Sequence, residues 1–217
     1  MTFLEAVNAV LRRLREDSVT ASNANQYSKL IGDFVNQAIY DTEHAWDWNC
    51  LKETIEITTV ASQQDYAFST TDVKIIVGVN DTANWYMRKT TDFQQAGEDF
   101  LTTTSTGSPY FYSFLGKSGT SSKIRLQPTP TGVESIKFLV VKHTDEKALD
   151  ATDDSDELTI PSLPIVLSAY ARAVSERGED GGIGVNEANR EASSALADAI
   201  AMDAGLNHPE KVSWHAI

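Results

Sequence analysis

The N-terminal part of the chain places apolar residues at helical spacing. The positions that recur three or four residues apart are Phe3, Val7, Val10, Leu11 and Leu14. This stripe predicts an amphipathic helix. Thr2, with Glu5 three residues later, is typical of a capping box at the helix start. Arg12, Arg13 and Arg15 crowd the expected last turn, where we expect their positive charges to complement the helix dipole.

A polar stretch at residues 18–25 leads into a longer helix, expected over about residues 26–47. Its apolar stripe consists of Tyr27, Leu30, Ile31, Phe34, Ala38, Ile39, Ala45 and Trp46. At about 1.5 Å per residue this helix would run roughly 30 Å, enough for the spine of a helical bundle. We expect Trp46 and Trp48 to form a helix–sheet junction, as wedges between the helix and the sheet that follows.

From Thr54 onward the apolar period changes from 3.6 to 2, which indicates strands. The alternating or continuous apolar positions are Ile55, Ile57, Tyr66, Phe68, Val73–Val79, Ile124, Leu126, Ile136, Phe138 and Val140. Tyr110, Tyr112 and Phe114 are predicted to share one face of a further strand. Short strands between turn-rich segments predict an antiparallel β-sandwich or small barrel. Residues 102–108 have neither period and predict an exposed loop.

The C-terminal part returns to helical spacing. Ser162 is expected to cap a helix that carries Pro164 in its first turn and ends at Gly178. A turn at residues 179–184 then precedes a last helix over about residues 186–204. Small residues recur on one face of this helix: Ala188, Ala192, Ala195 and Ala199, followed by Met202. Such a seam permits close packing against another helix.

These patterns together predict an α+β fold. Residues 1–50 and 161–206 are expected to form an antiparallel bundle of about four helices. Residues 51–160 are expected to form the inserted antiparallel β-sandwich or small barrel. That insert ends in an acidic connector at residues 145–157. Residues 207–217 are left as a C-terminal tail.

The tail carries apolar residues that a free chain end does not need. They are Pro209, Val212, Trp214 and Ile217. Because chain ends are usually mobile unless they dock onto something, these residues predict a docking tail. Packing of the tail back onto its own subunit is an alternative that the sequence leaves open.

The charge of the chain excludes some partners. Thirty-one acidic and 18 basic residues give a formal net charge of −13, the wrong sign for a protein that binds DNA by neutralising phosphates. Residues 145–157 hold seven of the acids and one lysine, and we expect a solvated connector there. No apolar stretch reaches the roughly 18 residues of a membrane span. The first residues lack the basic and apolar regions of a signal peptide.

The candidate chemistry is weak. The lone Cys50 excludes an internal disulfide framework, and we expect it to be a small buried hydrophobe. Gly116-Lys117-Ser118 lacks the earlier glycine of a phosphate-binding loop. The four histidines show no pair at metal-ligand spacing. We therefore predict no metal, no cofactor and no catalytic site, although carboxylate pairs for glycoside hydrolysis stay open because their separation depends on the fold.

Two stretches of local sequence are distinctive. The first is Ala45-Trp46-Asp47-Trp48-Asn49-Cys50-Leu51, which runs into Thr54-Ile55-Glu56-Ile57-Thr58-Thr59. The second is Leu158-Thr159-Ile160-Pro161, followed by Glu176-Arg177-Gly178-Glu179 and the alanine-rich residues 186–205. With the helix–strand–helix order, these stretches resemble the head-to-tail adaptor (connector) proteins of tailed bacteriophages. The resemblance is greatest to the tail tubular protein A-like adaptors of short-tailed phages.

The resemblance implies a structural virion protein, made in the host bacterial cytoplasm, that is no enzyme. Members of this family form homo-oligomeric rings, usually of twelve subunits, beneath the portal protein. They extend the DNA channel and offer an attachment surface to the tail nozzle or tail tube, and sometimes to tail fibres. The helical bundle would form the ring, and the docking tail would reach the portal. DNA would pass through without specific binding, along a bore whose carboxylates repel phosphates at short range.

Two other classes of function stay open. The first is a carbohydrate- or host-surface-binding module of a phage tail, with an aromatic surface on its β-sandwich. Its candidate binding residues are Trp85, Tyr86, Tyr110 and Tyr112. The second is an enzyme whose carboxylates lie in the β-rich region. Binding to glycans would favour the module, and turnover of cell-wall polysaccharide would favour the enzyme.

Overall fold

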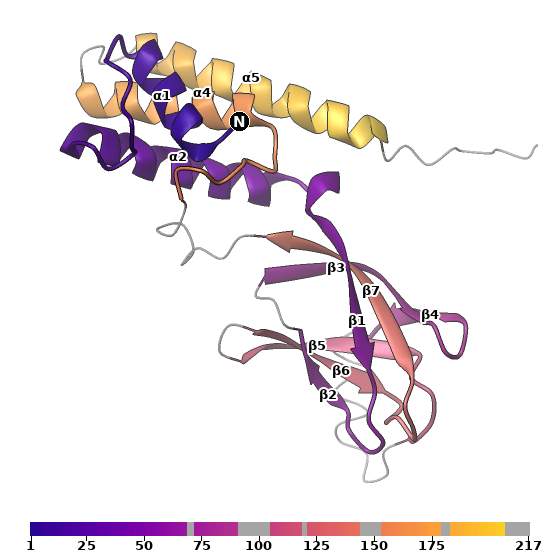
Figure 1. The fold of residues 1–217 in the computed structure, drawn as a ribbon. Coiled ribbons are helices and arrows are strands. Elements are labelled where there is room, and N and C mark those ends of the chain that lie inside the picture. The colour runs from indigo at the N-terminus through magenta and orange to yellow at the C-terminus, as the bar shows by residue number, and fades with distance from the viewer. Residues whose placement is uncertain (69–71, 91–104, 119–120, 144–152, 179–182, 207–217) are drawn as a thin grey trace, which may run out of the picture. The chain divides into compact units, whose positions relative to one another are not determined.

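The computed structural model describes residues 1–68, 72–90, 105–118, 121–143, 153–178 and 183–206. Within these residues four α-helices and seven strands form an α+β fold, which confirms the predicted class (Figure 1). The chain divides into two compact units. The helical unit comprises Met1–Cys50 and Glu146–Ile217, and the β unit comprises Leu51–Asp145.

Helix α4 lies at the centre of the helical unit. The helices of this unit are α1 (Phe3–Arg13), α2 (Gln26–Ala45), α4 (Ser162–Arg177) and α5 (Ile183–Leu206). Helix α4 packs against each of the other three, and Figure 1 shows it between them. Its successive residues Ile165, Val166 and Leu167 are all buried. A helix that is apolar around most of its circumference belongs in the middle of a bundle.

The start of α1 is capped from two sides. The predicted capping box is present, because the Glu5 amide donates to Thr2 Oγ1 and the Thr2 amide donates to Glu5 Oε2. The amide of Phe3 donates to the Asp156 carbonyl at 2.9 Å and that of Leu4 to the Asp154 carbonyl at 3.2 Å. Of residues 153–157 all but Asp154 are exposed, in keeping with the expected solvated connector, and their carbonyls also accept from the first amides of the helix, which need acceptors. Residues 144–152 lie outside the described residues.

The end of α1 is a Schellman motif. The Glu16 amide donates to the Leu11 carbonyl at 2.9 Å, and the Arg15 amide donates to the Arg12 carbonyl at 3.1 Å. Arg15 has a φ of 61° and occupies the left-handed position that usually belongs to glycine. The expected last turn is therefore corrected, because the helix ends at Arg13 and Arg15 lies outside it.

Helix α2 ends at Ala45, two residues earlier than expected, because a tryptophan takes one of its last carbonyls. Trp48 is fully buried, and its Nε1 donates to the Thr42 carbonyl at 2.8 Å. This bond satisfies a carbonyl that has no partner inside the helix. The short turn η1 (Asn49–Leu51) follows, and it leaves Cys50 exposed. The prediction of a buried Cys50 is wrong, since Trp48 is the residue that turns inward here.

The two C-terminal helices differ from expectation at their starts. Helix α4 begins at Ser162 itself, after Pro161 at the capping position, and no side chain caps it. Its end at Gly178 is confirmed, with a φ of 63° in the left-handed region. Helix α5 begins at Ile183, so the predicted turn is too long and Gly184 lies inside the helix. A glycine in the first turn of a helix costs little because most helical stability comes from packing against other elements, here against α4.

The β unit is one seven-stranded sheet that curls around its own core. Its strands are β1 (Lys52–Thr58), β2 (Asp65–Ala67), β3 (Asp72–Asn80), β4 (Trp85–Lys89), β5 (Phe111–Ser118), β6 (Ser121–Gln127) and β7 (Ser135–His143). They follow the order β1-β7-β3-β4-β5-β6-β2. Among the described strand pairs only β4 and β5 are parallel. The sheet is therefore mixed, because that one pair needs a crossover and not a hairpin. Of the loop predicted at 102–108, residues 102–104 lie outside the described residues.

The core of the β unit gathers around one phenylalanine. Its buried members are Ile57, Tyr66, Phe68, Met87, Tyr112, Ile124, Leu126, Ile136, Phe138 and Val140. The Phe138 ring meets those of Phe68 and Tyr112 edge to face, with centroids 5.7 Å and 5.4 Å apart. Directly across the ladder stands Gly78, where an added Cβ would lie 2.7 Å from the Phe138 ring. Phe138 therefore fills the space over a glycine.

Candidate functional site

The described residues contain no group of three or more His, Cys, Asp and Glu side chains arranged to hold a metal ion. The buried carboxylate Glu134 accepts a hydrogen bond from the Asn80 amide, which also donates to the Pro109 carbonyl at 3.2 Å. These bonds join loops of the β unit. Burial raises the pKa of the Tyr112 phenol, which lies inside the same unit. Glu134 and Asn80 thus have structural hydrogen bonds, and neither they nor Tyr112 form part of a catalytic cluster among the described residues.

One carboxylate fastens the end of α5 to the end of α2. Asp203 Oδ2 accepts a hydrogen bond from Trp46 Nε1 at 3.0 Å. The amide nitrogen of Asn49 lies 3.3 Å from the same oxygen, and its side-chain Nδ2 donates to the Asp203 carbonyl at 3.1 Å. Trp46 and Trp48 thus bond to helices of their own unit, and the wedge against a sheet stays a prediction. Asp203 went unrecognised because nothing in its local sequence marks it.

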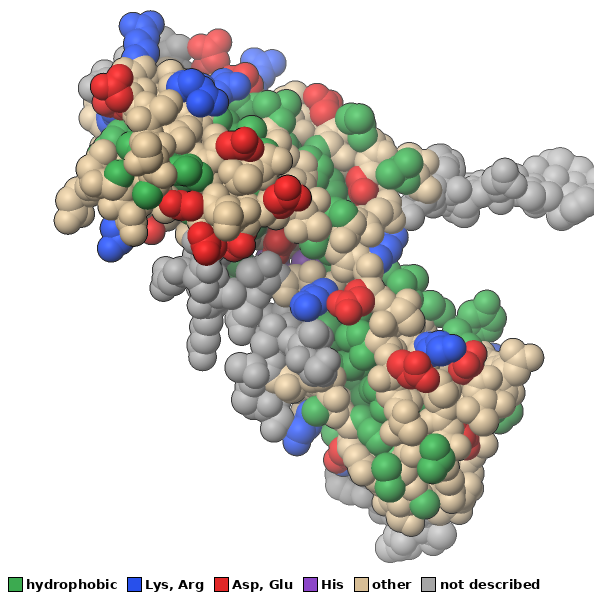
Figure 2. Space-filling model, in the orientation of Figure 1, with side chains coloured by type: hydrophobic (Ala, Val, Ile, Leu, Met, Phe, Trp, Pro, Cys, Tyr) green, Lys and Arg blue, Asp and Glu red, His purple; other side chains and the backbone are tan. Residues whose placement is uncertain are grey.

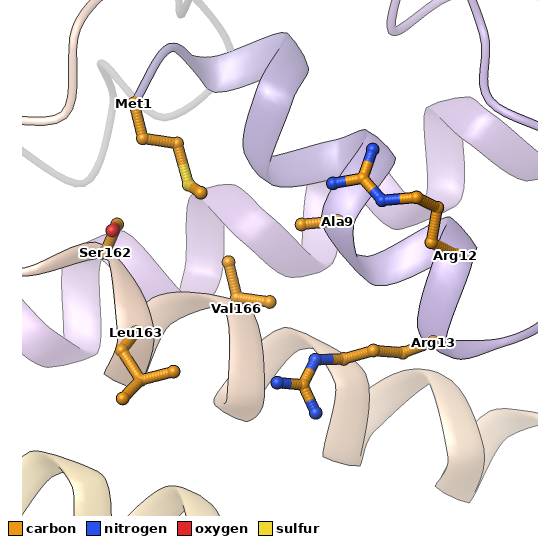
Figure 3. A pocket seen from close by; sticks show the side chains of 7 residues that line it. All are labelled: Met1, Ala9, Arg12, Arg13, Ser162, Leu163 and Val166. Atoms are coloured by element: carbon orange, nitrogen blue, oxygen red, sulfur yellow. The ribbon is translucent and has the colours of Figure 1, made fainter.

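A groove of about 480 Å³ runs between α1 and α4. Figure 3 shows Met1 and Leu163 at one end of it, Arg12 and Arg13 at the other, and small or apolar side chains between. Leu163 is 56% exposed and Met1 49% exposed, so two apolar side chains lie open to solvent at this end. The α1–α4 groove therefore has an apolar end and a basic end.

The arginines of this groove differ from other arginines of the unit. Arg172 pairs with Asp41, and Arg177 pairs with Glu16. Within the part of the chain that the structure describes, no carboxylate pairs with Arg12 or Arg13. The Arg13 guanidinium lies 6.0 Å from the centre of the Tyr170 ring. The sequence marked these arginines only as partners of the helix dipole.

The outward side of α5 carries a second surface of mixed character. Its members recur four or seven residues apart, which places them on one face: Glu187, Glu191, Asp198, Met202 and Leu206. We call this set the α5 stripe. All five are exposed, with Met202 at 77% and Leu206 at 80%. Figure 2 shows basic side chains along one edge of the helical unit and acidic side chains spread over the rest of the visible face.

The alanine seam lies beside the α5 stripe on the surface of the helix. Helix α5 packs against α4, and Ala188 is buried while Ala192, Ala195 and Ala199 are half-buried. Met202, which we expected to extend the seam, is exposed instead because it belongs to the α5 stripe. Close helix packing through the seam stays a prediction. The docking-tail residues Pro209, Val212, Trp214 and Ile217 lie outside the described residues.

Three of the four aromatic residues considered for glycan binding are exposed. Tyr86 is 75% exposed, Tyr110 47% and Trp85 41%. Tyr112 is only 5% exposed, because it points into the β core against Phe138. Its proposed display to a ligand is therefore wrong. Trp85 Nε1 donates to the Pro109 carbonyl at 3.0 Å, which holds its indole in place.

No helix within the described ranges combines the length and the apolar character needed to cross a bilayer. The family model described as SU10 adaptor protein matches residues 1–211 of the chain. A comparison with curated proteins gives no match. The matched range takes in nearly all of both compact units, so the similarity extends beyond a single motif or domain.

Proposed function

The chain belongs to the SU10 adaptor protein family, and on this premise we propose that it is the head-to-tail adaptor of a tailed bacteriophage. In this proposal, copies of the chain form a ring, about twelve in number, beneath the portal. The ring extends the DNA channel and provides the attachment surface for the tail nozzle or tail tube. The protein is a structural component of the virion, and its role is not enzymatic.

The observation that carries the proposal is the match of the adaptor family over residues 1–211. A ring also needs two different surfaces on each subunit, because a head-to-tail contact joins unlike patches. The helical unit offers two candidates, the α1–α4 groove and the α5 stripe. Both expose large apolar side chains, which soluble proteins usually reserve for contacts with partners.

The acidity of the chain supports a passive channel. A net charge of −13 opposes tight binding to phosphates. Carboxylates that line a bore repel DNA when they lie within about 8 Å of it, the screening length at physiological salt. We propose that DNA passes through the ring without specific binding. A bore lined mainly by lysine and arginine would contradict this part.

We assign portal contact to the docking tail, residues 207–217. It combines Trp214 with Val212 and Ile217 in a short segment, and such apolar side chains need a surface to cover them. Removal of residues 207–217 should abolish binding to portal rings. Tyr86→Ala, which removes an exposed aromatic residue of the β unit, is the matched control and should bind normally.

Native mass spectrometry and light scattering, with and without rings of the cognate portal protein, test the function. The expected result is a closed ring of about twelve subunits that forms alone or on the portal. A chain that stays monomeric and ignores the portal would contradict the proposal. Cryo-electron microscopy of the complex would then place the bore and its charges.

One observation favours a second candidate, a glycan-binding module. Tyr86 and Trp85 are exposed neighbours on β4, and aromatic faces stack on sugars. Tyr86→Ala is the clean test, because Trp85 also holds a structural hydrogen bond to the Pro109 carbonyl. Binding on a glycan array that disappears with Tyr86→Ala would support this candidate. Equal signals from both proteins would exclude Tyr86 as a glycan-stacking residue.

A further inference from the structure

The two exposed surfaces of the helical unit are complementary in charge. The basic end of the α1–α4 groove holds Arg12 and Arg13, which have no carboxylate partner among the described residues. The α5 stripe presents Glu191 and Asp198, both exposed. Arginine pairs with carboxylates through a planar fork of donors, so unpaired arginines beside an apolar groove favour an acidic, partly apolar partner.

The order of charge along the two surfaces also agrees. In the groove the basic end is at the end of α1, and the apolar end is at Met1 and Leu163. On the α5 stripe the acids come first, and Met202 and Leu206 come last. Phe3 to Arg13 spans about 15 Å of helix, and Glu191 to Met202 spans about 16 Å. An antiparallel approach of the stripe to α1 therefore sets acids against arginines and apolar side chains against one another.

The stripe does not fill the groove of its own subunit, because all five of its members are exposed and no described residue of α5 lines the groove. Helix α5 packs on α4, and Ala188, which lies beside the stripe, is buried. Asp203 is held by Trp46 and Asn49, which fixes the rotation of the helix. The exposed stripe is consequently open to a second copy of the chain.

We propose that the α1–α4 groove of one copy receives the α5 stripe of a second copy of this chain. This inference rests on the ring proposed above and names its subunit contact. Each copy then uses one surface toward each neighbour, which is the head-to-tail arrangement that generates a closed ring. Arg12 and Arg13 meet Glu191 and Asp198, while Leu163 and Met1 cover Met202 and Leu206.

A charge-swap experiment tests the contact. The groove variant carries Arg12→Glu and Arg13→Glu, and the stripe variant carries Glu191→Lys and Asp198→Lys. Each variant alone sets like charges together and should lower the fraction of subunits in rings at least tenfold. An equimolar mixture restores opposite charges at every contact, and it should form rings of alternating subunits with an even subunit number. Native mass spectrometry reads both results from subunit masses.

Matched variants keep the result interpretable. Lys29→Glu with Arg190→Glu makes the same charge change at exposed positions outside both surfaces and should form rings normally. Met202→Asp tests the apolar part. Because Met202 is 77% exposed, the variant should keep its circular dichroism and melting temperature while it loses rings.

The outcomes separate the two proposals. If the wild type forms rings and both charge variants also do so alone, the contact is wrong and the adaptor function stands. A mixture of folded variants that stays unassembled likewise overturns the contact. Variants that form rings but lose the portal would assign these surfaces to the portal. A wild type that stays monomeric with and without the portal overturns the function and the contact together.

Discussion

The helical unit and the β unit bury their apolar residues in different ways. In the β unit a single curled sheet surrounds its own core, with Phe138 at the centre. In the helical unit α4 buries most of its surface, but the α1–α4 groove and the α5 stripe leave Met1, Leu163 and Met202 exposed. The comparison teaches that the β unit closes its core with one sheet while it still exposes single apolar residues such as Tyr86 and Val133, whereas the helical unit gathers its exposed apolar residues along the groove and the stripe.

The strongest way to break this comparison is to empty the core of the β unit. Phe138→Ala removes a fully buried ring and should cost about 3–5 kcal/mol of stability, as buried aromatic truncations usually do. Hydrogen exchange followed by mass spectrometry should show lost protection in strands β1 to β7 and normal protection in helices α1, α2, α4 and α5. Equal loss in the helices would mean that the two units do not fold separately.

A smaller effect is expected from a change at Gly78, the glycine that faces the Phe138 ring. Gly78→Ala places a Cβ 2.7 Å from the Phe138 ring and should cost about 1–3 kcal/mol, the usual range for overpacking. Urea denaturation measures the loss. Phe138→Leu in the same chain should relieve the clash, so the two changes together should cost less than their sum. Strict additivity would show that the ring is not what restricts position 78.

In the helical unit the corresponding residue is an arginine that connects the ends of three helices. Arg177 donates to Glu16, to Tyr27 Oη at 2.7 Å and to the Leu14 carbonyl at 3.4 Å. The bonds to Glu16 and Tyr27 raise the pKa of its guanidinium. Arg177→Lys keeps the charge but loses the fork, and it should lower stability by about 1 kcal/mol. Thermal unfolding measures this. Arg172→Lys is the comparison and should cost less, because among the described residues Arg172 bonds only to Asp41 and Ser168.

The smallest expected effect sharpens the comparison by stabilising the helical unit. Arg15→Gly places glycine at the left-handed position after α1 and should raise stability by about 0.5 kcal/mol. The expected gain in the free energy of unfolding is the backbone strain of Arg15 that glycine removes, minus the conformational entropy that glycine adds to the unfolded chain. Arg15→Ala keeps the strain and serves as the control in the same urea titration. A destabilised glycine variant would show that the arginine side chain contributes more than its backbone costs.

Local signals predicted much of the helical unit. The capping box at Thr2 and the left-handed Gly178 follow from side chains within three or four residues, and both are present. The prediction for Cys50 is wrong because its environment depends on Trp48, and the sequence did not predict the hydrogen bonds from the start of α1 to the acidic segment at 153–157. Such contacts join distant parts of the chain, and periodicity carries no information about them.

The same limit applies to the candidate surfaces. The sequence predicted Arg12 and Arg13 at the end of the first helix. It could not predict that no described carboxylate pairs with them, because that depends on how the helices pack. The aromatic alternation around Tyr112 gave the right period and the wrong face, since alternation does not say which side is buried. The curl of the sheet decides that.

The bonds from Trp46 and Asn49 to Asp203 constrain how the length of α5 can vary. One residue inserted between Ala188 and Asp203 would turn the earlier part of the helix by about 100° relative to this anchor. The acids at Glu187 and Glu191 would then rotate off their face. Only insertions or deletions of about seven or eleven residues, close to whole turns, leave both ends in phase. Relatives of different α5 length should therefore differ by such steps.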